Sequence, residues 1–132
     1  MRGPRAAPAL LAALCAAALA SGADRVVFSA KEPGEWAGKE GKHVPLLTVA
    51  DGVATIHNLH GQSKEHHITR HWLEDASGRQ VGAAHPWSTE DEVLRSRIPL
   101  PKSFTGTVTA FAHCNEHGIW RSAPVKVAGG EL

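Results

Sequence analysis

The histidines and cysteines of this sequence are its most informative residues. The chain of 132 residues contains nine histidines, and imidazole is the most common metal ligand in proteins. One thiolate combined with several imidazoles suits iron, copper or zinc, and it disfavours calcium and magnesium. Five candidate ligands fall in three separate stretches of the chain: His43, then His60 and His66, then Cys114 and His117.

The spacing and number of these residues bear on the kind of site. Cys114-x-x-His117 lets both side chains reach one ion, and the spacer between His60 and His66 contains a glycine that allows a turn. Structural zinc takes four ligands, usually with more thiolates. Four imidazoles and one thiolate would leave one octahedral position open. The pattern therefore predicts a redox-active ion that can bind a small molecule.

The N-terminal segment has the composition of a secretory signal peptide. Arg2 and Arg5 precede an Ala/Leu-rich run over residues 6–20, which is too short to span a membrane comfortably and ends in a small-residue cleavage pattern. We expect residues 1–23 to be a signal peptide and the protein to be secreted or periplasmic. An uncleaved anchor and a lipoprotein cysteine at Cys15 are the alternatives, and the large Leu14 argues against the second.

Removal of this segment would leave Cys114 as the only cysteine of residues 24–132. A lone cysteine in an oxidising compartment must pair between chains, remain free, or serve as a ligand. Coordination would explain how the thiol persists there. The net charge of +1 gives no case for nucleic acid or an anionic membrane surface as a partner.

The elements that must position these residues are predicted to be strands. The length of 24–132 fits one domain, and no helix pattern of useful length follows the N-terminal segment. Roughly seven short strands with turn residues between them predict an all-β antiparallel sandwich. Asp51-Gly52 is a strong hairpin signal. The expected strands lie near 25–29, 45–50, 53–59, 66–73, 80–84, 93–100, 106–114 and 124–127.

The strand expected at 106–114 leads directly into the last candidate cluster. By period-two alternation, Val108, Ala110, Ala112 and Cys114 share one small apolar face, which places the cysteine at the end of a rigid, core-facing strand. His113 points the other way. We expect the sulfur to accept hydrogen bonds from nearby backbone N–H groups and from Asn115.

Taken together, the motifs match a known family in order and spacing. The chain resembles the superoxide reductases, that is, neelaredoxin and the iron-binding domain of desulfoferrodoxin, over about residues 36–120. The most specific element is Cys-Asn-x-His-Gly-x-Trp, beginning at Cys114. The other matching elements are Trp36, the run Gly38-Lys39-Glu40-Gly41-Lys42-His43-Val44-Pro45, His60-x5-His66 with Ile68, Val81-Gly82 and Ala110.

The resemblance implies an immunoglobulin-like sandwich and a single iron that reduces superoxide to hydrogen peroxide. An exposed lysine before the first ligand maps onto Lys42, which would attract the anion. The chain lacks the four-cysteine rubredoxin-like domain of desulfoferrodoxin, so an external one-electron donor, rubredoxin-like or other, is implied. A homo-oligomer is left open. The resemblance makes His43, His60, His66 and His117 the equatorial ligands and Cys114 the axial one.

Two departures from the family pattern concern the loops. The family's glutamate, which binds the oxidised iron, is replaced here by Gly41, and Glu40 lies one residue earlier. The flexible glycine could let Glu40 reach the site; otherwise water or hydroxide closes it. The family's His-Pro-Met is here His60-Gly61-Gln62, so His60 is expected to be held less rigidly.

Other interpretations remain for this composition. A copper electron carrier is also a β-sandwich with a cysteine, but it usually has two histidines and an axial methionine, which 24–132 lacks. A metal-free binding module would leave the lone cysteine unexplained. Trp36 and Trp120 are expected beside the site. The remaining histidines are expected to be surface or packed polar residues: His57, His67, His71, His85 and His113.

Overall fold

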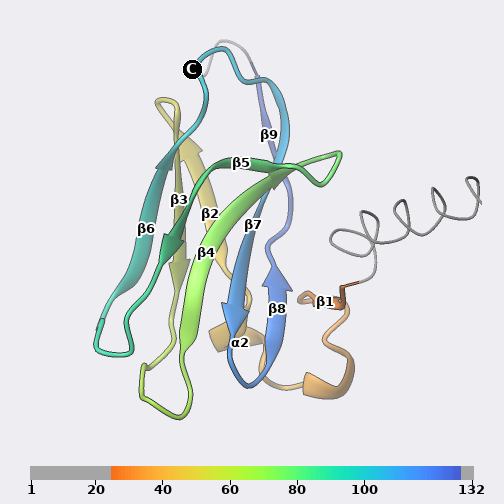
Figure 1. Cartoon of the computed structure of the whole chain (residues 1–132). Coiled ribbons are helices and arrows are strands. Elements are labelled where there is room, and N and C mark those ends of the chain that lie inside the picture. Colours follow the sequence, from red (N-terminus) through yellow and green to blue (C-terminus); the bar gives the residue numbers. More distant parts are fainter. Residues whose placement is uncertain (1–24, 129–132) are drawn as a thin grey trace, which may run out of the picture.

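Two β-sheets pack face to face in the computed structural model of this protein, which describes residues 25–128 (Figure 1). The segment expected to be a signal peptide lies outside the described residues. The larger sheet has the order β1-β8-β7-β4-β5, with β9 also paired to β7, and the smaller sheet has the order β2-β3-β6. The two layers confirm the predicted sandwich.

The bounds of the strands are as follows. The larger sheet contains β1 (Val27–Phe28), β4 (Ile68–Asp75), β5 (Gln80–Pro86), β7 (Gly106–Cys114), β8 (Gly118–Arg121) and β9 (Val125–Val127). The smaller sheet contains β2 (Leu46–Ala50), β3 (Val53–Asn58) and β6 (Leu94–Pro99).

Two short helical segments lie between β1 and β2. They are the 3-10 turn η2 (Gly34–Trp36) and the single-turn helix α2 (Glu40–His43), which sits near the lower ends of β7 and β8 in Figure 1. A one-turn helix carries no amphipathic repeat, which is why periodicity did not indicate it. None of the helices within residues 25–128 has the length and apolar character needed to cross a membrane.

The larger sheet contains one strand that was not predicted and one strand pair that is parallel. β8 was not predicted, because its four residues follow directly after a turn and are too few to show alternation. β1 pairs with β8 in parallel, through Val27 with Ile119 and Phe28 with Trp120, so the larger sheet is not purely antiparallel. All other strand pairs in the described residues are antiparallel. The eight expected strands are present, seven of them with shifted ends and the one at 106–114 with the predicted bounds.

The predicted hairpin joins β2 and β3. Asp51 and Gly52 have φ values of 52° and 76°, the left-handed conformations that a two-residue turn of this type requires. Leu46 then lies opposite His57, so the turn sets the register that brings the start of β2 beside the end of β3. This end of the sandwich carries the candidate ligands.

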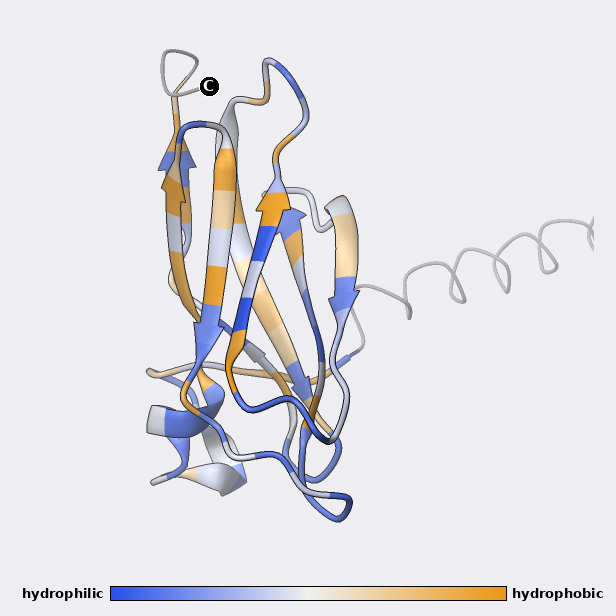
Figure 2. Ribbon diagram, turned by 90° about the vertical axis from the view of Figure 1, so that its left-hand side faces the viewer, coloured by the Kyte–Doolittle hydropathy of each residue, from blue (hydrophilic) through white to orange (hydrophobic). Residues whose placement is uncertain are grey.

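The core lies between the two sheets, and Figure 2 shows hydrophobic bands along the strands. Ala54 and Ile56 of β3 face Leu73, Val108 and Ala110 of the larger sheet, and all five are fully buried. The alternation predicted for β7 is confirmed, since Val108, Ala110, Ala112 and Cys114 are all inaccessible to solvent. The packed sheets thus provide a rigid base for the loops below.

The start of the described chain is attached to β4 by an ion pair. The guanidinium of Arg25 donates two hydrogen bonds to the buried carboxylate of Glu74, one of them 2.6 Å long. Trp72 Nε1 donates a third to the same carboxylate at 2.8 Å. Arg25 also lies over the ring of Phe111 at 4.9 Å, so it covers the outer face of the larger sheet.

Candidate metal centre

Three histidines and the cysteine come together at one end of the sandwich. One ligand atom from each of His43, His66, Cys114 and His117 lies within 4.8 Å of the others. His60 joins this group, because its Nε2 is 3.2 Å from His66 Nε2. Residues from three distant parts of the sequence therefore share one small volume.

The short helix α2 orients the first of these side chains. His43 lies at the end of the turn, is 3% exposed, and donates a hydrogen bond from Nδ1 to the carbonyl oxygen of Lys39 at 2.9 Å. This bond leaves Nε2 as the ring nitrogen with the free lone pair. His43 Nε2 is buried and has no hydrogen-bond partner in the described residues. A buried acceptor without a partner is costly, and a cation at the cluster would satisfy it.

The loop between β3 and β4 brings in His60 and His66. Gln62 closes this loop, since its side chain accepts from the Ile68 N–H at 2.8 Å and donates to the Ile68 carbonyl at 3.0 Å. Ser63 Oγ accepts from the His66 N–H at 3.1 Å. These bonds restrain the loop, although it has Gly61 where the family that the sequence resembles has a proline. His60 Nδ1 is buried and has no hydrogen-bond partner within residues 25–128, and the looser hold expected for His60 stays a prediction.

The end of β7 supplies Cys114, and the turn after it supplies His117. Cys114 is a fully buried free thiol, and its Sγ lies 3.5 Å from His117 Nδ1. Gly118 has φ +82°, and a Cβ there would lie 3.2 Å from the Phe28 ring. The glycine after His117 is therefore required both by the backbone conformation and by the close approach of β1.

Asn115 has a different role from the predicted one. Its side chain was expected to bond the cysteine sulfur, but Oδ1 accepts from the His67 N–H at 2.8 Å and Nδ2 donates to the Glu65 carbonyl at 2.9 Å. Both ends of the amide thus hold the loop that carries His66. The prediction was wrong because the turn places this side chain beside the 60–67 loop rather than over the sulfur.

Burial favours the neutral form of the imidazoles. It lowers the pKa of His43 to about 4, with neighbouring histidines adding to the effect. Burial likewise lowers the pKa of His60 and of His117, in each case with His66 as the next cause. These three rings are therefore neutral near pH 7, the form in which imidazole binds a metal ion.

The cysteine is subject to opposing influences. Burial raises the pKa of the Cys114 thiol, while the backbone amides of Glu116 and His117 lower it by favouring the thiolate. A cation bound to the sulfur would strongly favour the thiolate over the thiol. The sulfur thus has the surroundings of a metal ligand rather than of an exposed reactive thiol.

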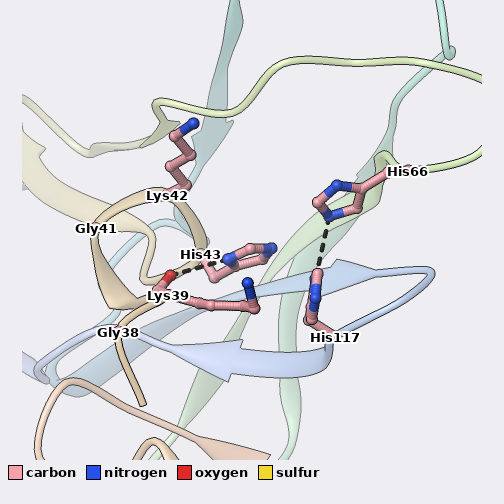
Figure 3. A pocket seen from close by; sticks show the side chains of 7 residues that line it. All are labelled: Gly38, Lys39, Gly41, Lys42, His43, His66 and His117. Carbon is pink, nitrogen blue, oxygen red and sulfur yellow. Dashed lines mark hydrogen bonds between the residues drawn. The ribbon is translucent and has the colours of Figure 1, made fainter. Parts of the chain in front are cut away.

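A pocket of about 420 Å³ opens onto the imidazoles. Its lining comprises Gly38, Lys39, Gly41, Lys42, His43, His66 and His117 (Figure 3). In Figure 3 the Lys39 side chain extends along the pocket toward the rings, whereas Lys42 points away from them. Lys39 also contributes to the lowered pKa of His117. From the sequence, only Lys42 was expected to give the pocket its charge. Lys39 was missed, because its spacing of four from His43 indicates proximity only if the segment is helical.

Glu40 binds the backbone of its own loop. Its Oε1 accepts a hydrogen bond from the Gly38 N–H at 2.9 Å, and Glu40 is not among the residues that line the pocket. A carboxylate that reached the imidazoles from this position would have to release Gly38 first.

Two tryptophans flank the cluster. Trp36 meets His117 edge to face at 4.6 Å between ring centroids, and Trp120 stacks on His43 at 5.4 Å. Trp120 Nε1 donates to the His117 carbonyl at 3.0 Å. Both therefore lie beside the candidate ligands, as predicted, and fix the rings by packing.

The other histidines lie outside the cluster. His113 bonds Thr69 Oγ1 at 2.8 Å, His67 bonds the Ser63 carbonyl, and His85 packs on Trp87. His57 is half-buried on β3. His71 is completely buried and forms hydrogen bonds with two polar side chains. Of the two roles expected for it, surface or packed polar residue, it therefore has the second. These placements agree with the polar or surface roles expected for them.

The donor atoms fit one metal ion. Two nitrogens bound at right angles to an ion, each about 2.1 Å away, would lie ~3 Å apart, and opposite ones ~4.2 Å apart. The distances of 3.1 Å from His66 to His117 and 3.2 Å from His60 to His66 match neighbouring ligands. All ligand atoms of the group of four lie within 4.8 Å of one another, which is compatible with two ligands on opposite sides of the ion. A thiolate with several imidazoles is a donor set suited to iron, copper or zinc.

Comparison with known proteins agrees with this arrangement. The sequence profile of the desulfoferrodoxin family matches residues 35–123, which is more than half of the chain. None of the curated protein sequences compared with this chain matches it.

Several solved structures share the fold. A superoxide reductase from Treponema pallidum is 20% identical with a TM-score of 0.52, covering 66% of this chain and 69% of that one. A superoxide reductase (1Fe-SOR) from Giardia intestinalis is 20% identical with a TM-score of 0.53, covering 65% and 98%. A superoxide reductase from Nanoarchaeum equitans is 15% identical with a TM-score of 0.54, covering 77% and 100%. Since the profile matches more than half of the chain, the chain belongs to the desulfoferrodoxin family.

Proposed function

We propose that this protein reduces superoxide to hydrogen peroxide at one iron ion held by five side chains. The proposed ligands are His43, His60, His66, His117 and Cys114. The observation that supports this most directly is the convergence of the cysteine sulfur and the imidazole nitrogens on one small volume. Membership in the desulfoferrodoxin family supports the same conclusion.

The reaction needs one electron and two protons for each superoxide ion. Iron bound at the cluster would supply the electron and return to the ferrous state through an external one-electron donor, which is the proposed protein partner. The protein's own groups have to attract the anion, fix the imidazoles and admit protons. The pocket is lined by Lys39 and Lys42, which are both exposed, so protons can arrive from solvent.

The two lysines give the pocket a positive entrance. Their ammonium groups would raise the local concentration of a small anion, even though the net charge of the chain is only +1. Lys39 extends toward the rings, so we assign it the final approach of the anion and Lys42 the outer field. Glu40 would close the oxidised site only after leaving Gly38.

The sulfur and the neutral rings hold the iron in a defined environment. The backbone amides of Glu116 and His117 favour the thiolate of Cys114. Hydrogen bonds of this kind tune the reduction potential of a metal–thiolate centre. A copper electron carrier is not favoured, because the group contains more imidazoles than such a site uses and the family match points elsewhere.

We also propose that the protein acts outside the cytoplasm. This rests on the signal-peptide pattern of residues 1–23 in the sequence. N-terminal sequencing of the protein from the separated fractions of its native cell tests it: a mature chain beginning between Ser21 and Arg25 supports export, and an intact Met1 in the cytoplasmic fraction contradicts it.

The decisive experiment measures metal content, colour and products together. The purified protein should contain one iron per chain, show a thiolate-to-iron charge-transfer band when oxidised, and convert superoxide to hydrogen peroxide without releasing oxygen. Cys114→Ser should abolish the band. His66→Ala should lose iron, whereas the neighbouring control His67→Ala should retain it. Oxygen release at half the amount of superoxide consumed would indicate dismutation instead.

A further inference from the structure

A chain of hydrogen bonds crosses the core beside the proposed centre. His71 Nδ1 lies 2.8 Å from Ser96 Oγ, His71 Nε2 lies 2.8 Å from Asn58 Oδ1, and Asn58 Nδ2 donates to the Lys42 carbonyl at 2.9 Å. The three side chains are almost inaccessible to solvent, at 1% for Ser96, 0% for His71 and 3% for Asn58. They come from β6, β4 and β3, so the chain of bonds joins the two sheets.

The donors in this chain all point toward Lys42. The Lys42 carbonyl is an acceptor, so the Asn58 amide must present its NH₂ group there and its oxygen to His71. His71 must then donate from Nε2 and accept the Ser96 hydroxyl proton at Nδ1. This requires a neutral ring, and burial lowers the pKa of His71 to about 3. Hydrogen bonds aligned in one direction strengthen one another in a low-dielectric interior.

The end of this chain acts on the peptide between Lys42 and His43. The Lys42 carbonyl lies at the C-terminal end of α2, where a helix leaves carbonyl groups without partners inside the helix. Since this carbonyl and the His43 N–H belong to one planar peptide, the bond from Asn58 fixes the plane from which His43 departs. The His43 ring is fixed separately by Lys39.

Two of these three residues lie on the strands that flank the loop bearing two other proposed ligands. Asn58 ends β3, two residues before His60, and His71 lies on β4, which begins two residues after His66. We propose that Ser96, His71 and Asn58 form an inter-sheet latch that positions α2, and with it His43, against the segments bearing His60 and His66. They are positioning residues, because none of them lines the pocket or belongs to the ligand group.

Truncation of the latch should loosen α2 even without metal. In the Asn58→Leu variant the Lys42 carbonyl loses its partner, so the Val44 amide, which closes the α2 turn by donating to the Glu40 carbonyl at 2.9 Å, should exchange with deuterium about tenfold faster. Ser96→Ala removes only the far end of the chain and should show the same effect more weakly, with rescue by Ser96→Thr. Val127→Ala, in the core at the opposite end of the sandwich, is the control for general loss of stability.

A second measurement concerns the metal and rests on the proposed function. Asn58→Leu should weaken Fe²⁺ binding about tenfold in anaerobic competition with a chromophoric chelator, while Val127→Ala should bind as the wild type does. Unchanged Val44 exchange in both latch variants, or equal acceleration in Val127→Ala, would overturn the latch. A wild type that binds no Fe²⁺ would overturn the proposed function, and the exchange data on metal-free protein would still decide the latch.

Discussion

Asn115 and His67 are joined by two reciprocal hydrogen bonds. The Asn115 N–H donates to the His67 carbonyl at 3.0 Å, and the His67 N–H donates to Asn115 Oδ1 at 2.8 Å. The pair couples the turn that bears Cys114 to the loop that bears His66, so the two segments move as one unit. The asparagine of the Cys-Asn-x-His motif therefore serves the histidine loop.

Asn115→Ala should separate these two segments. It removes the bonds to the His67 N–H and the Glu65 carbonyl, and we expect a loss of about 1–2 kcal/mol in the free energy of unfolding, measured by urea titration. Iron affinity should fall about tenfold. Asn115→Asp keeps the acceptor and loses the donor, so it should be intermediate. Equal behaviour of Asn115→Ala and the wild type in both assays would refute the coupling.

Lys39→Ala and Lys42→Ala should slow the capture of superoxide without changing iron content. We expect a three- to tenfold loss at low ionic strength, of the order that local charge confers, with the larger loss for Lys39 because its side chain extends toward the rings. Stopped-flow rates at several salt concentrations measure it. Lys126→Ala on the distant β9 removes the same charge and should have little effect. A larger loss for Lys42 would reverse the two assigned roles.

Glu40→Gln tests whether the carboxylate reaches the iron. Glutamine keeps an oxygen that can accept from the Gly38 N–H, so the loop should stay intact. We expect the absorption spectrum of the oxidised protein to be unchanged, because the Glu40 oxygen is already engaged by Gly38. A shifted charge-transfer band in Glu40→Gln, with unchanged thermal stability, would instead assign the carboxylate to the metal.

Acid should destabilise the metal-free protein through its buried histidines. Burial holds the pKa of His43 at about 4 and of His71 at about 3, below the ordinary 6.5. The unfolded chain therefore binds these protons first as the pH falls. The stability that these neutral rings contribute is complete above pH 6.5. It is lost as the pH falls toward 4 for His43 and toward 3 for His71. In thermal unfolding from pH 7.5 to 4.5, Tm should fall below pH 6.5, and more shallowly for His71→Leu than for Val127→Ala.

Arg25→Met should leave the buried Glu74 carboxylate with Trp72 as its remaining hydrogen-bond donor. We expect a loss of about 1–3 kcal/mol in the free energy of unfolding, because Glu74 is only 6% exposed. The double variant Arg25→Met/Glu74→Gln should recover part of that loss. Arg79→Ala breaks an exposed pair with Asp75 at 4.0 Å and should cost less than about 0.5 kcal/mol. A similar loss for Arg79→Ala would show that burial of Glu74 is not the cause.

Local sequence patterns were enough to predict the sandwich, the hairpin at Asp51-Gly52 and the residues that form the cluster. Alternation along 106–114 revealed which face of β7 is buried, and the types and spacing of the histidines and Cys114 indicated transition-metal chemistry. Such patterns are local, so they can be recognised without knowing what lies opposite each strand.

The contacts that hold these residues in place depend on the folded arrangement and could not be predicted. α2 is one turn long and β8 has four residues, so neither has a periodic pattern, and both form because neighbouring segments bind them. The roles of Asn58 and His71 depend on partners that are close in space but distant in sequence. The role of Lys39 depends on the short turn before His43, which alternation along the sequence does not show. Hydrogen bonds between distant segments form only after both sheets have packed, and a single sequence does not reveal which polar residues will meet.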